Sequence, residues 1–202
     1  MTPSVVRSLL PPLLQSSFLS DIQQHLLDTG SFHDVCFVVQ EERVPAHRGL
    51  LYARCEYFRS MFGAGFREGD SGEIHIEGTY SAACIALLKH LYTDNMEVDD
   101  DAVLFDLARL CDQYRVERLL NNCLHQLLNS ITVQNAVVRL VQAHTASGES
   151  PMWAELKSKA ISYVARNFGE IWCKARTSLE LLDHTHLGLC KQILLIKCGL
   201  IE

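Results

Sequence analysis

The stretch DVCFVV at residues 34–39, followed by VPAHRGLL at 44–51, decides the fold of this chain. The first stretch is rich in β-branched and aromatic side chains, which is typical of a strand. Polar residues then turn the chain into a short second strand at 43–45. The apolar spacing changes to a helical one over about 47–54 and 56–62. We therefore expect a hairpin that leads directly into two helices.

The residues outside these segments predict a mixed front and a helical rear. Upstream, apolar residues recur at helical spacing over 18–27, behind an arm at 1–17 that contains three prolines. Downstream, Glu73 to Glu77 alternates polar and apolar residues, which indicates a half-buried strand. Beyond Gly78 the spacing stays helical. The expected fold class is α+β, with a short sheet at the front, followed by an all-α region.

The composition is that of a globular protein, with 202 residues of which 48% are hydrophobic and 21% charged. This length suits one domain or two small ones. The eight cysteines include no CxxC pair, and most lie at apolar positions of periodic segments. They indicate a reduced setting and no disulfide framework. We therefore expect a cytoplasmic location, with the nucleus as the alternative.

Charge and hydropathy argue against two classes of partner. The formal net charge is -6 and the chain contains no basic run, whereas binding to a phosphate backbone needs clustered Lys and Arg. No stretch approaches the roughly 20 apolar residues of a membrane span. We expect neither nucleic acid nor a membrane among the partners.

The residue spacings also argue against an enzyme or a metal protein. Cys123 and His125 are two positions apart, as are His184 and His186, and residues at that spacing do not share a helix face. These spacings lack the paired ligands of a structural zinc site. None of the motifs GxSxG, GxGxxG or GxxxxGK[ST] occurs. We expect no catalytic residues, no metal and no cofactor.

Four segments in order carry a family resemblance. They are AHRGLL at 46–51, YFRSMF at 57–62, LLKHLYT at 87–93 and LARLCDQY at 107–114. In this order they resemble the BTB/POZ domain, and the resemblance covers residues 18–128. Members of that family pair with themselves, and many dock onto cullin-3 through a loop of the form apolar-x-Glu. The resemblance therefore implies the BTB/POZ fold, a small three-layered cluster of helices with a short sheet, and a protein-binding role without chemistry.

A second, weaker resemblance covers the rear of the chain. Residues 132–136 and 161–168 are similar to the opening of a BACK domain, a helical module that often follows BTB in cullin-3 adaptors. We expect residues 130–202 to form an incomplete BACK-like region. The resemblance implies that its first helices extend the cullin surface.

The sharpest candidate site is a glycine-spaced loop that carries an aromatic residue two positions before an acid. The resemblance implies that Phe66 fills an apolar pocket on cullin-3 and that Glu68 adds a polar contact. The alternatives are that Phe66 folds back onto its own domain, that Tyr114 is a half-buried core residue, and that Met61 and Phe62 belong to the core. The residues assigned to cullin binding are Phe66, Arg67, Glu68, Tyr114, Met61 and Phe62.

A second candidate site serves self-association. The helix at 18–27 exposes a wide apolar face if the protein is monomeric, and a symmetric partner can cover that face. The resemblance implies that Asp34 and Arg48 meet near the dimer seam, and the alternative is two separately solvated charges. The residues assigned to the dimer interface are Phe18, Leu19, Ile22, Leu26, Asp34 and Arg48.

Three functions fit these patterns. The first is a homodimeric, non-catalytic substrate adaptor of a cullin-3 ubiquitin ligase, with an unidentified substrate or partner protein. The second is a self-association scaffold for repressor or cytoskeletal complexes that does not bind a cullin. The third is a decoy that mixes with longer BTB proteins and blocks them.

Overall fold

The computed structural model describes residues 17–63, 72–146, 150–183 and 187–198. The chain forms two compact units, residues 1–99 and 100–202. The first unit contains a sheet and helices, and the described part of the second contains helices alone, so the expected α+β class is confirmed. The domain boundary expected at 128–130 stays a prediction.

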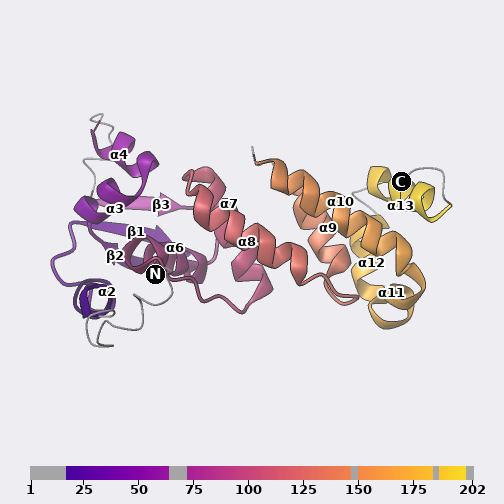
Figure 1. Cartoon of the computed structure of the whole chain (residues 1–202), viewed down its shortest axis with the longest axis horizontal. Helices are drawn as coiled ribbons and strands as arrows, with labels where there is room; N and C mark the ends of the chain where they lie inside the picture. The colour runs from indigo at the N-terminus through magenta and orange to yellow at the C-terminus, as the bar shows by residue number, and fades with distance from the viewer. Residues whose placement is uncertain (1–16, 64–71, 147–149, 184–186, 199–202) are drawn as a thin grey trace, which may run out of the picture. The chain divides into compact units, whose positions relative to one another are not determined.

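The sheet of the first unit has a central strand flanked on both sides. Strand β1 (Val35–Val39) pairs antiparallel with β2 (Glu42–Ala46) and parallel with β3 (Glu73–Ile76), in the order β2-β1-β3 (Figure 1). Ile74 and Ile76 of β3 are buried, as the alternating sequence predicts. All three strands expected from the sequence are therefore present.

The helices of the first unit also lie where the apolar spacing predicts them. They are α2 (Ser17–Ile22), η2 (Gln23–Leu27), α3 (Arg48–Arg54), α4 (Glu56–Gly63) and α6 (Ser81–Thr93). The expected front helix changes at Gln23 into a wider π-helical turn, in which the N–H of Asp28 donates to the carbonyl of Gln23 at 2.8 Å. Phe58 of α4 is fully buried, and its ring meets Phe37 of β1 edge to face.

A histidine and a tyrosine join the loop before β1, the start of α3 and the end of α6. The N–H of His47 donates to the hydroxyl of Tyr92 at 2.9 Å, and that hydroxyl lies 2.7 Å from His47 Nδ1. His47 Nε2 lies 2.7 Å from the carbonyl of Ser31, which can only accept. Nε2 therefore carries the proton, and Nδ1 accepts from Tyr92. Burial raises the pKa of Tyr92 to about 12, which keeps its hydroxyl a donor.

Gly30 is required by both its backbone and its surroundings, and we expect Gly30→Ala to lower the free energy of unfolding. Its φ is +59°, and an added Cβ would lie 2.6 Å from Cγ of Pro45. The left-handed backbone alone costs a residue with a Cβ about 1–2 kcal/mol, and the clash adds to this. Gly78→Ala is the matched control. The φ of Gly78 is also left-handed, at +67°, but a Cβ added there would have nothing within 4 Å.

Urea denaturation of the two alanine variants separates these terms. Gly78→Ala reports the backbone strain alone, and Gly30→Ala reports strain plus the contact with Pro45. Equal losses of stability in the two variants would contradict a close approach of Gly30 to Pro45.

The second unit is helical throughout its described residues. Its helices are α7 (Asp101–Gln113), α8 (Glu117–Asn129), α9 (Ala136–Thr145), α10 (Pro151–Arg166), α11 (Phe168–Lys174), α12 (Arg176–Asp183) and α13 (Leu187–Lys197). Asp100 caps α7, because its Oδ1 accepts from the N–H groups of Ala102 at 2.7 Å and Val103 at 3.1 Å. Ser150 caps α10, with Pro151 in the first turn.

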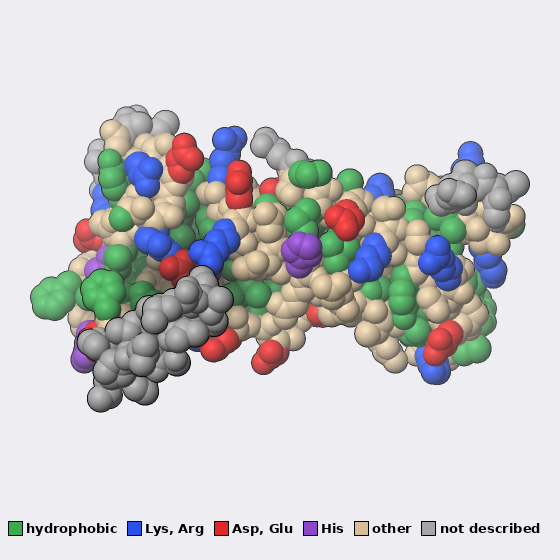
Figure 2. Space-filling view, viewed as in Figure 1, with side chains coloured by type: hydrophobic (Ala, Val, Ile, Leu, Met, Phe, Trp, Pro, Cys, Tyr) green, Lys and Arg blue, Asp and Glu red, His purple; other side chains and the backbone are tan. Residues whose placement is uncertain are grey.

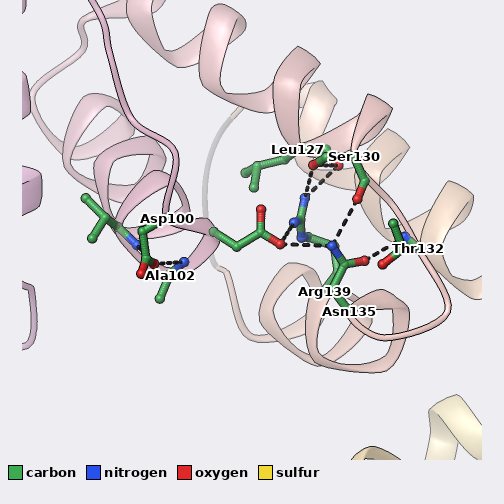
Figure 3. Close-up of polar contacts among 9 residues, drawn as sticks. Asp100, Ala102, Leu127, Ser130, Thr132, Asn135 and Arg139 are labelled. Atoms are coloured by element: carbon green, nitrogen blue, oxygen red, sulfur yellow. Dashed lines mark hydrogen bonds and ion pairs between the residues drawn. The ribbon is translucent and has the colours of Figure 1, made fainter. Parts of the chain in front are cut away.

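A buried arginine joins three segments of this unit (Figure 3). Arg139 of α9 is 1% exposed, and it donates to the carbonyl of Leu127 at 2.6 Å and to Oδ2 of Asp101 at 2.6 Å. Asn135 donates to the same carboxylate oxygen at 2.9 Å and to the carbonyl of Ser130 at 2.9 Å. The start of α7 and the end of α8 are thus tied to α9 by charge-assisted hydrogen bonds.

Candidate protein-interaction surfaces

The front helix of the first unit presents apolar side chains to solvent. Phe18 is 72% exposed and Leu19 is 42% exposed, whereas Ile22 and Leu26 are partly buried. No residue of η2 is fully buried. Figure 2 shows hydrophobic side chains that project from the edge of this unit at the left of the view. We call Phe18, Leu19, Ile22 and Leu26 the front-helix surface, and its assignment to a dimer interface stays a prediction.

Asp34 and Arg48 meet within one chain. The backbone N–H of Arg48 donates to Oδ1 of Asp34 at 2.8 Å, and Nε of Arg48 donates to the carbonyl of Asp34 at 3.2 Å. Arg48 is the first residue of α3, whose leading N–H groups have no partner inside the helix. Asp34 therefore supplies a cap from outside the helix. The place of this pair at a dimer seam stays a prediction.

The end of α4 places two of the proposed cullin-binding residues at partly buried positions. The ring of Phe62 stacks on Phe58 with centroids 6.0 Å apart, and the guanidinium of Arg48 lies 5.4 Å from the centroid of the Phe62 ring. Met61 is also partly buried. Both residues therefore keep part of their surface exposed, and their assignment to cullin binding stays a prediction.

The central part of the proposed cullin loop is not described. Phe66, Arg67 and Glu68 lie outside the described residues, and their assignment stays a prediction. The α4 helix ends at Gly63, three residues before Phe66 in the sequence. Gly63 therefore belongs to the packed helix that carries Phe62.

Tyr114 of the second unit is 3% exposed, which is closer to the core alternative than to a freely exposed contact residue. It is the C-cap of α7, and its N–H donates to the carbonyl of Leu110 at 2.9 Å. An open hollow lies beside this turn and next to the start of α10. The hollow is lined by Asp112, Arg115, Glu117, Leu120, Asn121, Ser150, Pro151 and Met152. A partner that contacts this turn meets a mixed polar and apolar surface.

Among the described residues outside the front helix, the three most exposed large apolar side chains are not identified by the sequence pattern. Phe32, in the loop before β1, is 91% exposed, and Trp172 of α11 and Leu194 of α13 are 50% and 57% exposed. Trp172 and Leu194 sit in helices whose apolar spacing indicates core. Phe32 is a single aromatic residue in a short polar loop, and no periodic pattern assigns it to a surface.

Two kinds of feature are absent from the ranges that the structure describes, a cluster of metal ligands and a membrane-spanning helix. No group of three or more His, Cys, Asp or Glu side chains there has an arrangement that could hold a metal ion. None of the helices in those ranges has the length and apolar character needed to cross a bilayer.

Comparison with known proteins identifies similar sequences. Residues 23–131 match the family model described as the BTB/POZ domain. BTB/POZ domain-containing protein 9 of Bos taurus is 37% identical over 113 residues, which is 54% of this chain and 18% of that protein. Kelch-like protein 22 of Homo sapiens is 32% identical over 146 residues, which is 71% of this chain and 22% of that protein.

A solved structure is also similar to part of this chain. The BTB domain of zebrafish PATZ1 is 25% identical, with a TM-score of 0.47, and the match covers 55% of this chain and 89% of that one. The chain spans about a fifth of the length of the curated relatives that it matches.

Proposed function

This chain belongs to the BTB/POZ family, and from that premise we propose that it is a non-catalytic adaptor that pairs with a second copy and docks onto cullin-3. The family's domain is a protein-interaction module. In the proposed assembly each copy presents the end of α4 and the loop that follows to a cullin, so a dimer carries two ligase arms. The substrate protein is chosen by the rear helices or by a further partner, and the adaptor works in the cytoplasm or the nucleus.

The observation that carries this proposal is the extent and position of the family match. Residues 23–131 include α4, the stretch Phe66 to Glu68 and Tyr114, which together are the segments assigned to cullin binding. The similarity to Kelch-like protein 22 runs over 146 residues, so it is longer than the BTB/POZ match. The likeness therefore supports a shared arrangement that includes more than the BTB/POZ segment.

The chemistry of the loop supports a compact docking contact. An aromatic side chain that enters an apolar pocket is a frequent energetic centre of protein interfaces, and its truncation often costs about 2 kcal/mol or more. Glu68 adds a charge whose pairing across the interface favours one register of docking. Phe58 anchors α4, the helix that precedes this stretch in the sequence, in the core.

We expect the double variant Phe66→Ala, Glu68→Ala to lose capture of the amino-terminal domain of cullin-3. Loss of the aromatic anchor alone predicts a rise in Kd of about 30-fold or more. The measurement is titration of the purified chain with that domain, and light scattering checks that the variant keeps its mass. Trp172→Ala, which removes a half-exposed aromatic residue from the second unit, is the control. Capture of cullin-3 at the wild-type Kd by the double variant would rule out the loop as the docking element.

A self-association scaffold is the second candidate, and the burial of Tyr114 favours it. At 3% exposure this side chain offers a cullin little area, whereas the front-helix surface offers a second copy exposed Phe18 and Leu19. The two functions separate in the wild-type protein: a dimer that binds the cullin-3 domain is an adaptor, and a dimer that does not bind it at micromolar concentration is a scaffold.

A further inference from the structure

Phe32 combines full exposure with a left-handed backbone. Its φ is +60°, and its side chain is 91% exposed. Residues with a Cβ adopt this conformation at an energetic cost, because the Cβ crowds the following carbonyl oxygen. Exposure of a large ring to water adds a second cost. Backbone outliers of this kind concentrate at binding sites.

Hydrogen bonds on both sides hold Phe32 in this conformation. Before it, the carbonyl of Ser31 accepts from Nε2 of His47 at 2.7 Å. After it, Nδ1 of His33 donates to the carbonyl of Gly30 at 2.9 Å. Further bonds in the same turn are Thr29 Oγ1 to the carbonyl of His25 at 2.8 Å and the N–H of Ser31 to Thr29 Oγ1 at 3.2 Å. The ring is therefore presented by a braced turn, which limits the entropy lost when the ring binds.

We propose that Phe32 is an anchor of self-association, whose ring inserts into a second copy of this chain. A rigid, exposed aromatic side chain is the usual form of an interface hot spot. The inference rests on the proposed pairing of two copies and adds to it a residue outside the front helix. It assigns the loop before β1, together with the front-helix surface, to one interface.

The charges beside Phe32 favour a second copy over an unlike partner. A two-fold interface applies the same patch to itself, so a patch of one sign would repel its copy. Asp34 lies two residues after Phe32 and bonds directly to Arg48, so an acid and a base stand together at this site. A patch that is apolar and carries both signs is complementary to itself.

Phe32→Ala tests the anchor. We expect sedimentation analysis to show a rise in the dimer Kd of about tenfold or more, as for truncation of a hot-spot residue. Trp172→Ala, the matched control, removes another exposed aromatic ring and leaves the dimer Kd unchanged. An unchanged Kd in Phe32→Ala, or an equal rise in both variants, would overturn the proposal. Loss of cullin-3 capture by a Phe32→Ala protein that still dimerises would also overturn it, because the occupant would then be an unlike protein.

Phe32→Gly separates the anchor from the fold. Glycine and alanine both remove the ring, so both variants weaken the dimer alike, but glycine adopts φ +60° without strain. Measured as monomers at high dilution, Phe32→Gly has a higher Tm than Phe32→Ala. If Phe32 served only the fold, Phe32→Gly, which has the higher Tm, would weaken the dimer less than Phe32→Ala does. Equal weakening of the dimer in the two variants therefore identifies an anchor. A monomeric wild-type protein would instead refute the proposed self-association itself, and this anchor with it.

Discussion

Asp101→Ala is expected to lower the free energy of unfolding by about 3 kcal/mol, because it leaves a buried guanidinium without its counter-ion. Arg139 is 1% exposed, and its ion pair with Asp101, with N and O 2.6 Å apart, lies at the start of α7. After the change, Arg139 keeps the carbonyl of Leu127 but no negative partner among the contacts in Figure 3. The loss is at the low end for buried pairs, because the carboxylate is itself 47% exposed.

The double variant Asp101→Ala, Arg139→Met distinguishes an unpaired charge from a general loss of packing. Methionine replaces the guanidinium by an apolar chain of similar length, so no buried charge is left. We expect the double variant to unfold at a higher urea concentration than Asp101→Ala alone. Asp99→Ala, which removes an exposed acid two residues away, is the control and changes stability by less than about 0.5 kcal/mol. A double variant that is less stable than the single one would contradict the unpaired-charge account.

The elements with a strong local pattern could be predicted from the sequence. The alternating residues of β3 indicate a strand because burial on a half-buried sheet has a period of two residues. The β-branched residues of β1, which is buried almost throughout, indicate a strand because such side chains pack well on a pleated surface. The helix starts at Asp100 and Ser150 carry capping side chains that hydrogen-bond within two or three residues. These features depend on neighbours in the sequence, so the sequence alone contains them.

Contacts between distant residues could not be predicted in this way. Arg139 stands 38 positions after Asp101, and in its own segment it occupies what the periodicity marks as an ordinary polar position. The left-handed backbone of Phe32 lies between residues whose hydrogen bonds reach Gly30 and His47, and no pattern in the sequence indicates it. The family resemblance predicts that Asp34 and Arg48 meet. It does not predict that the carboxylate of Asp34 caps α3 by accepting from the backbone N–H of Arg48.

Phe58→Ala is expected to have the largest effect in the first unit, with a loss of about 3–5 kcal/mol in the free energy of unfolding. Phe58 is 0% exposed and packs against three aromatic rings, those of Phe37, Tyr57 and Phe62, at centroid distances of 5.7, 5.6 and 6.0 Å. Truncation leaves a cavity between β1 and α4 and removes three aromatic contacts, each worth about 0.5–1.5 kcal/mol. Ile85→Ala, at a 41% exposed position of α6, is the large-to-small control.

Phe58→Leu then separates the stability of the fold from the position of the proposed docking element. Leucine keeps most of the apolar volume, so its cost is near that of a volume-conserving exchange, less than about 1.5 kcal/mol. It removes the flat surface on which Phe62 stacks, and so it loosens the end of α4 just before the stretch that begins at Phe66. If α4 sets the position of the loop, Phe58→Leu weakens cullin-3 capture more than it weakens folding, whereas Ile85→Ala changes neither. Wild-type capture by a folded Phe58→Leu protein would show that the loop binds independently of the helix that precedes it.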